Sequence, residues 1–153
     1  MKLIVGLFTV LIAIIIAVAI SQGYFNANPF APKATVAIGK QTYKTTIATS
    51  DKDKQIGLSG KTTLSQDEGM LFSFEKPDYY AFWMKEMKFP IDIIFIKDSK
   101  IVTIFPSVPV PTSKDENPPV YKPEEPADAV LEINAGLSQK NNFKKGDVDT
   151  IKK

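Results

Sequence analysis

The feature that most constrains this chain is an uncharged apolar run at residues 3–20. As a helix that rises 1.5 Å per residue, the run would extend roughly 27 Å, close to the ~30 Å hydrocarbon core of a bilayer. A helix that is apolar on every face fits a membrane better than the edge of a small domain. Lys2 supplies the nearby positive charge, and the positive-inside rule places this end in the cytoplasm. We therefore expect a single-pass anchor in the cell membrane and a domain on the extracytoplasmic side.

A cleaved signal peptide is the alternative, because Ala17-Val18-Ala19 forms a small-x-small cleavage site. Cleavage near Ala19 would give a secreted protein. The length of the run favours the anchor, since it exceeds the apolar core of a usual signal peptide. The chain thus divides into an anchor or signal segment at 1–22, an extended tether with two prolines at 23–33, and a domain at 34–153.

The absence of cysteine and histidine limits the chemistry open to the domain. Without a thiolate or an imidazole, zinc sites, cysteine proteases and Ser-His-Asp triads are excluded. The acids lack the spacing of a known calcium loop, so we expect no metal and no cofactor. The formal net charge is only +2, and every positive side chain is a lysine. Because the arginine forks that read guanine and phosphate are missing, we expect no nucleic-acid partner.

The domain consists of short apolar segments separated by polar turns, a pattern typical of a small β sandwich or barrel. A hairpin is predicted at 36–38 and 42–47, and further strands at 70–74, 80–84, 91–96, 101–105, 130–134 and 148–151. The sequence Ser50-Asp51-Lys52-Asp53 matches a capping box and predicts one short helix that ends near Gly57. We therefore predict a mainly β fold with one short helix.

The composition changes after Phe105, where seven prolines and five acids precede Ala129 and interrupt any strand or helix period. This predicts a Pro-rich loop at 106–128. Loops of this length inside compact domains are either functional lids or disordered segments. The sequence leaves both alternatives open.

Five blocks of sequence, in the same order, resemble the family called domain of unknown function 192. They are EGMLF at 68–72, FWMK at 82–85, PIDIIFI at 90–96, VLEINAG at 130–136 and KGD at 145–147. The resemblance covers roughly residues 34–150. It implies a mostly β, sandwich-like fold that is often exported or tethered in bacteria and archaea, and it implies no known activity. The chain departs from the family at Glu86-Met87, where an Asn-Thr pair is common, and at Gly57-Leu58-Ser59-Gly60-Lys61, where an Arg commonly follows the first Gly-Leu-Met.

Charged side chains emerge from strands that are otherwise apolar. A period of two puts Asp92 on the face of Ile94, and likewise Lys85 on the face of Trp83 and Glu132 on that of Val130. A buried charge without a partner costs several kcal/mol, so we expect these groups either to pair, as Asp92 with Lys85, or to line a pocket. The candidate ligand-binding residues are Trp83, Lys85, Asp92 and Glu132.

Three functions are compatible with these residues. The leading hypothesis is a non-enzymatic, membrane-tethered binding module that takes a small polar ligand or an envelope partner in a cleft near the four candidates. A hydrolase or lyase would instead use Asp92 and Glu132 as paired carboxylates across an open cleft. A structural accessory domain of an envelope complex would need no cleft.

The anchor predicts the topology of the protein in the cell. The protein should remain in the membrane fraction, and protease added to spheroplasts should remove the domain, because the domain lies outside. Recovery of a soluble mature form that begins at Ile20 would instead identify Ala17-Val18-Ala19 as a cleavage site and contradict the anchor.

Overall fold

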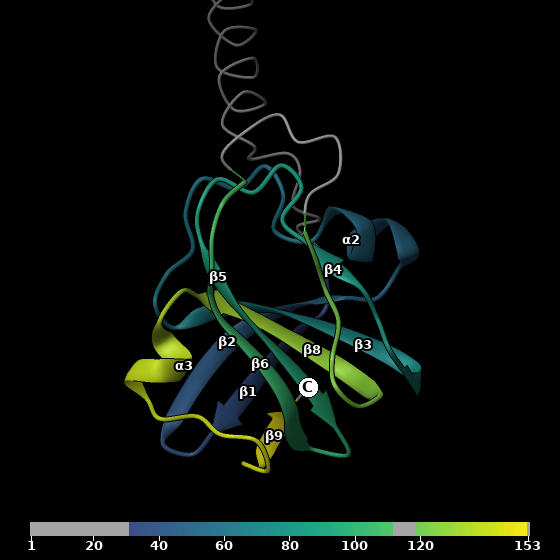
Figure 1. Ribbon diagram of the computed structural model, residues 1–153, viewed down its shortest axis with the longest axis vertical. Coiled ribbons are helices and arrows are strands. Elements are labelled where there is room, and N and C mark those ends of the chain that lie inside the picture. Colours follow the sequence, from purple (N-terminus) through teal and green to yellow (C-terminus); the bar gives the residue numbers. More distant parts are fainter. Residues whose placement is uncertain (1–30, 112–118, 153) are drawn as a thin grey trace, which may run out of the picture.

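One curled sheet dominates the computed structural model, which describes residues 31–111 and 119–152. Its seven strands lie in the order β6, β5, β8, β3, β2, β1, β9 (Figure 1). All neighbours are antiparallel except β2 and β3, which run parallel. The strands are β1 (Lys33–Ile38), β2 (Gln41–Ala48), β3 (Glu68–Asp78), β5 (Ile91–Lys97), β6 (Lys100–Val108), β8 (Ala127–Asn134) and β9 (Asp149–Lys152). A separate two-stranded ribbon pairs β4 (Phe82–Trp83) with β7 (Val120–Tyr121).

The two outer strands of the sheet return toward each other at one end. Ile101 N donates to Asp147 O, and Gly146 N donates to Ile101 O. Lys100 forms an isolated antiparallel bridge with Val148. The sheet therefore curls into a half-barrel. The prediction of a mainly β domain is confirmed, and of the two predicted architectures the chain adopts the barrel-like one.

Each face of the sheet has its own apolar core, because side chains alternate between faces along a strand. The inner core is formed by Ala34, Val36, Ile38, Tyr43, Ile47, Leu71, Ile94, Ile96, Ile101, Ala129, Leu131, Ile133 and Leu137. The outer core includes Phe72, Ile93, Phe95 and Val130. It lies under the β4–β7 ribbon and under the segment that follows the helix at residues 51–56. The central strands β5 and β8 are thus buried on both faces, which explains their nearly continuous apolar sequences.

The predicted helix is confirmed as α2 (Asp51–Ile56). Its capping box is complete, since Ser50 Oγ accepts from Asp53 N at 3.1 Å and Asp53 Oδ2 accepts from Ser50 N at 3.4 Å. The helix ends at Gly57, whose φ of +52° favours glycine. Figure 1 shows α2 beside β4.

Several element boundaries differ from the prediction, mainly at prolines. Residues 76–78, which separate two of the predicted strands, are part of β3, and β6 continues through Pro106 to Val108. The strand pairing shifts register at both places, and such bulges accommodate a proline that cannot donate to the ladder. The expected loop at 106–128 is therefore shorter, and β7 interrupts it; residues 112–118 lie outside the described residues.

Two further elements differ. The strand expected at 80–84 forms only the short β4, and a second short helix, α3 (Leu137–Lys140), lies between the strands predicted at 130–134 and 148–151.

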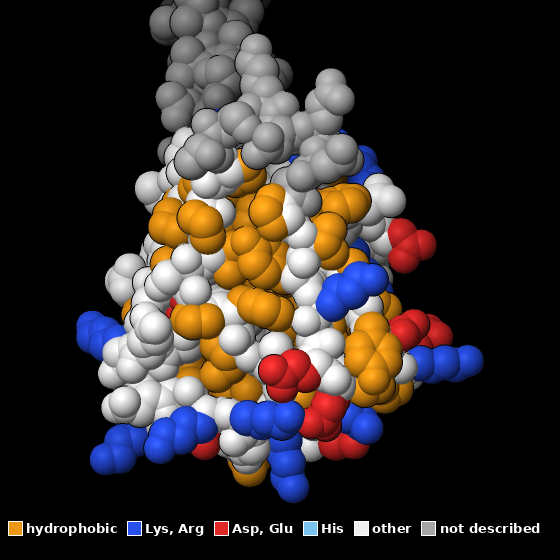
Figure 2. All heavy atoms as spheres, in the orientation of Figure 1, with side chains coloured by type: hydrophobic (Ala, Val, Ile, Leu, Met, Phe, Trp, Pro, Cys, Tyr) orange, Lys and Arg blue, Asp and Glu red, His pale blue; other side chains and the backbone are white. Residues whose placement is uncertain are grey.

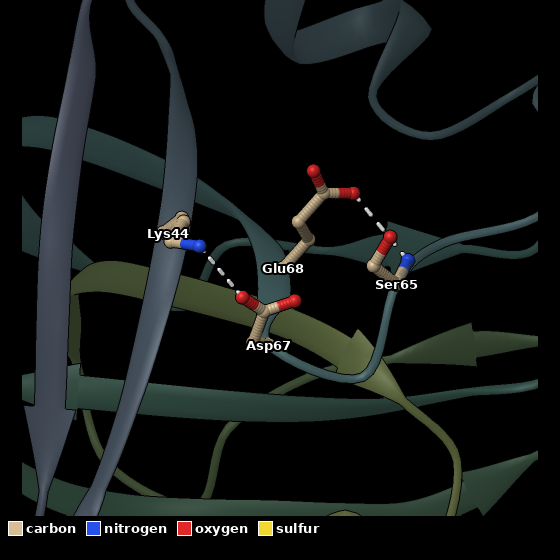
Figure 3. Close-up of polar contacts among 4 residues, drawn as sticks. All are labelled: Lys44, Ser65, Asp67 and Glu68. Atoms are coloured by element: carbon tan, nitrogen blue, oxygen red, sulfur yellow. Dashed lines mark hydrogen bonds and ion pairs between the residues drawn. The ribbon is translucent and has the colours of Figure 1, made fainter.

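Exposed charges at the start of β3 are paired on the surface (Figure 3). Lys44 Nζ lies 2.8 Å from Asp67 Oδ2, and Ser65 N donates to Glu68 Oε2 at 3.4 Å. The hydrogen bond between Lys44 and Asp67 raises the pKa of the lysine and lowers the pKa of the aspartate. Such exposed pairs contribute little stability, but these lie where β3 begins beside its parallel neighbour β2.

The predicted anchor at 3–20 and the tether up to residue 30 lie outside the described residues. Within residues 31–111 and 119–152, no helix is long and apolar enough to cross a membrane.

Candidate functional site

Asp92 lies on the inner face of the sheet and is fully buried. Its carboxylate accepts three backbone N–H groups, from Ser107 at 2.7 Å, Gly136 at 2.8 Å and Ser138 at 2.7 Å. The bulge of β6 turns Ser107 toward the carboxylate, and the other two donors lie at the start of α3. Asp92 therefore fixes two chain segments against the sheet. The alternative in which it pairs with Lys85 is wrong, because Lys85 is exposed and the backbone amides compensate the carboxylate.

Asp92 and Glu132 lie on opposite faces of the sheet. In the β5–β8 pair, Asp92 is opposite Ile133 and Glu132 is opposite Ile93. Directly opposed residues in an antiparallel pair share a face. The structure therefore does not bring the two carboxyl groups together, and they do not form the pair that a hydrolase or lyase would need.

Glu132 lies on the outer face, between Ile93 of β5 and Met70 of β3. Its side chain is 5% exposed, and its buried Oε2 has no hydrogen-bond partner among the residues that the structure describes. Gly57 lies directly over it: a Cβ at this glycine would be 3.9 Å from Glu132 Oε2 and 3.3 Å from Phe72 Cζ. Removing hydrogen-bonding water from such an oxygen costs about 1–3 kcal/mol, so the unpartnered carboxyl calls for an explanation.

A cleft of about 380 Å³ opens beside Glu132. One wall is the end of α2 with the following segment to Ser59, and the other walls are mostly aromatic: Phe72, Phe74, Tyr80, Phe82 and Trp83. Phe72 and Phe82 meet edge to face with ring centroids 4.9 Å apart, while Phe74 and Tyr80 stack at 3.5 Å. The cleft is therefore a shaped apolar slot with a carboxyl group among its lining residues.

The environment of Glu132 determines its protonation state. Burial raises the pKa of its carboxyl from 4.5 to about 8. At pH 7 the group is therefore mainly protonated, and it can both donate and accept a hydrogen bond. Strongly shifted carboxyl groups that line a cleft are characteristic of functional sites.

A second buried acid, Asp149, lies outside this cleft. Both of its carboxyl oxygens lack a partner among the described residues, and burial raises its pKa, with a smaller contribution from the charge of Asp128. It lies in β9 opposite Ile38. Glu132 is the stronger candidate, because an aromatic-lined cleft adjoins it.

The four predicted residues thus occupy three environments. Trp83 and Glu132 line the same cleft. Lys85 lines a neighbouring depression that shares Trp83, and Asp92 is inside the half-barrel.

Gly57, Phe72 and Phe74 were not predicted as cleft residues. Their only sequence signal was a glycine at the end of the helix and aromatic residues alternating on β3. Neither signal predicts that the segment after α2 lies over β8.

Comparison with protein families identifies the family of this chain and leaves its activity open. The model of the DUF192 family, described as "Uncharacterized ACR", matches residues 34–151. A crystal structure of a protein of unknown function from Novosphingobium aromaticivorans has a TM-score of 0.70 at 28% identity, and the match covers 81% of this chain and 90% of that one. A "putative transcription regulator" from Sinorhizobium meliloti has a TM-score of 0.72 at 28% identity, over 81% and 97% of the two chains. A search of curated proteins gave no match.

Asp92 should be a structural carboxylate that is independent of Lys85. In Asp92→Asn an NH2 group, which cannot accept a hydrogen bond, replaces one carboxylate oxygen, so at least one of the three buried N–H donors faces another donor. We expect urea denaturation to show a loss of about 2–4 kcal/mol in the free energy of unfolding. Adding Lys85→Met should change this loss by less than about 0.5 kcal/mol. Substantial recovery in the double variant would show that the two side chains interact.

Glu132 should make stability fall as pH rises. The pKa of its carboxyl is about 8 in the folded protein and near 4.5 in the unfolded chain. The contribution of the neutral acid to stability is therefore fully present below pH 4.5, and it is lost as the pH rises from there to 8. Between about pH 5 and pH 8 the group should lower the free energy of unfolding by about 1.4 kcal/mol per pH unit. Urea denaturation of Glu132→Gln should lack this slope, and Glu75→Gln, which alters an exposed glutamate of β3, should retain it. Parallel pH profiles for wild type and Glu132→Gln would refute the buried neutral carboxyl.

Proposed function

We propose that this chain, which belongs to the DUF192 family, is a non-enzymatic binding module that takes a small ligand in the cleft beside Glu132. In this proposal residues 3–20 hold the module on the extracytoplasmic side of the membrane. The ligand has an apolar body that contacts the aromatic walls and at least one polar group that reaches the carboxyl of Glu132.

The observation that carries the proposal is the unpartnered Oε2 of Glu132 beside a cleft. A structural carboxyl in the same sheet, that of Asp92, has three hydrogen bonds. The chain is therefore able to satisfy a buried acid where the acid serves the fold. An acid left without a partner at the edge of a cleft is suited to a ligand that supplies the missing hydrogen bond.

The aromatic side chains support the same function. Trp83 is 50% exposed although it lines the cleft, and its neighbour across the ribbon, Val120, is 53% exposed. Figure 2 shows apolar side chains gathered on the upper and middle part of one face, with charged side chains mainly along its lower edge and right side. An exposed tryptophan beside a cleft offers a flat apolar face on which a ligand can stack.

The alternatives receive less support from the same residues. Catalysis by paired carboxylates lacks its geometry, because Asp92 and Glu132 face opposite sides of the sheet. A purely structural accessory domain would have no use for a cleft of about 380 Å³ beside an unsatisfied acid.

Benzyl alcohol, which has one apolar ring and one hydroxyl, is a suitable probe of the cleft. The chain has a single tryptophan, so the indole N–H resonance of the full-length protein reports on Trp83 alone. We expect saturable shifts of this resonance and of the Gly57 amide on titration. Trp83→Ala, followed through the Gly57 amide, should weaken binding about 3- to 10-fold, as expected for loss of one aromatic contact.

The matched control is Tyr79→Ala, because Tyr79 is also about half exposed at 53% but does not line the cleft. This variant should bind benzyl alcohol as the wild type does. Shifts that never saturate, or equal weakening by both substitutions, would contradict a binding site in the cleft.

A further inference from the structure

Two of the polar side chains that line the cleft, those of Ser59 and Tyr80, already have hydrogen-bond partners. Ser59 Oγ donates to Lys85 O at 2.8 Å, and the Tyr80 hydroxyl donates to Lys76 O at 2.8 Å. Glu132 is the deeply buried polar group of the lining whose Oε2 has no partner among residues 31–111 and 119–152. A polyol such as a sugar needs several hydrogen bonds to replace those that it makes with water. The cleft instead suits a ligand with one strong polar group and an otherwise apolar body.

The aromatic wall of the cleft already attracts an ammonium group from the chain itself. Lys54 Nζ lies 4.7 Å from the centroid of the Phe74 ring, and this ring is stacked on Tyr80. Faces of aromatic rings attract cations through the ring quadrupole, and the attraction is stronger where water is excluded. The same walls continue past Phe82 and Trp83 toward Glu132.

The other charged side chains that line the cleft are one acid and one lysine. Asp51 and Lys54 lie on α2 at its rim, and their opposite charges are one helical turn apart. The strand neighbours of Glu132 are the apolar Ile93 and Met70, and Gly57 covers it from the helix side. Among the described lining residues, β3 and the segment 80–83 contribute no charged side chain.

From these contacts we propose that the ligand of the cleft is an organic ammonium ion, with an apolar body against the aromatic walls and an N–H group on the Glu132 carboxylate. This inference rests on the proposed binding function and specifies its ligand class. An ammonium gains more than a neutral donor from such a site, because a charge pair at a buried carboxylate is stronger than a neutral hydrogen bond.

Binding of the cation is coupled to loss of a proton. The free protein has Glu132 mainly as the neutral acid at pH 7, since burial raises its pKa. When the ammonium enters, the O–H bond of the carboxyl breaks, its proton passes to the solvent buffer, and the carboxylate pairs with the cation. The cation brings one positive charge into the site, and the released proton takes one away. The buried pair of carboxylate and ammonium is therefore neutral.

Benzylammonium and benzyl alcohol form a matched pair of probes, because they have the same ring and differ in charge. For the full-length protein we expect the affinity for benzylammonium to rise about tenfold per pH unit below pH 8 and to level off above it. The affinity for benzyl alcohol should not depend on pH in this range. Calorimetry in two buffers of different ionisation enthalpy should show release of about one proton per benzylammonium at pH 7.

Glu132→Gln keeps the shape of the side chain and removes its charge. It should weaken benzylammonium binding by more than about tenfold, abolish proton release and leave benzyl alcohol binding nearly unchanged. Glu75→Gln removes an exposed carboxylate from β3 and should bind both probes as the wild type does. The full-length proteins, with their predicted anchor, are all kept in the same detergent. Partition of the probes into micelles therefore cancels in these comparisons.

The outcomes separate this inference from the proposed function. Equal, pH-independent affinity for the two probes, with Trp83→Ala weakening both, would overturn the ammonium ligand and leave the binding cleft in place. The same conclusion would follow if benzylammonium bound without proton release or bound equally well to Glu132→Gln. Failure of both probes to bind would contradict the cleft as a ligand site.

Discussion

The structure depends on how two neighbouring central strands each bury one carboxyl group. β5 and β8 are covered on both faces, so the acid on each must lie in an apolar core. Register places Asp92 inside the half-barrel and Glu132 outside it. A buried acid has to be stabilised by donors, neutralised or supplied with a partner. The chain uses the first solution for Asp92 and the second for Glu132.

The two solutions have different consequences for the fold. The three amides around Asp92 belong to the bulge of β6 and the start of α3, so this carboxylate holds the end of the half-barrel in place. Glu132 receives no comparable donors from the described chain, and burial keeps it protonated at neutral pH. In the proposed function, its position beside an aromatic cleft couples ligand binding to the folding energy, because a ligand that supplies a partner would restore the hydrogen bond that the fold leaves unmade.

Much of the domain could be predicted from local pattern. The hairpin of β1 and β2, the capping box of α2 and the apolar runs of β5 and β8 are visible in the sequence, because alternation, capping and burial all act over a few residues. Alternation also indicated that Asp92 shares a face with Ile94 and Glu132 with Val130. The prolines were misleading, since bulges in β3 and β6 accommodate Pro77 and Pro106 within strands.

The site itself needed information that the sequence does not contain. Whether two acids on adjacent strands share a face depends on the register between the strands, and a shift of one residue would have reversed the result. The approach of Gly57 to Glu132 joins positions far apart in the chain, and two of the three partners of Asp92 come together only once α3 has formed. The predicted Asp92–Lys85 pair was wrong for this reason: backbone amides are present in every sequence, and their convergence on one carboxylate is a property of the fold.

The protonation state of Glu132 is the central claim, and a titration of its side-chain carboxyl carbon tests it most directly. In protein labelled with ¹³C at glutamate, assigned by comparison with Glu132→Gln, the Glu132 signal should change with a midpoint near pH 8, well above the ordinary glutamate value of about 4.3. A Glu132 midpoint in that ordinary range would show that the carboxyl is ionised and solvated at neutral pH, and would contradict this account of the cleft.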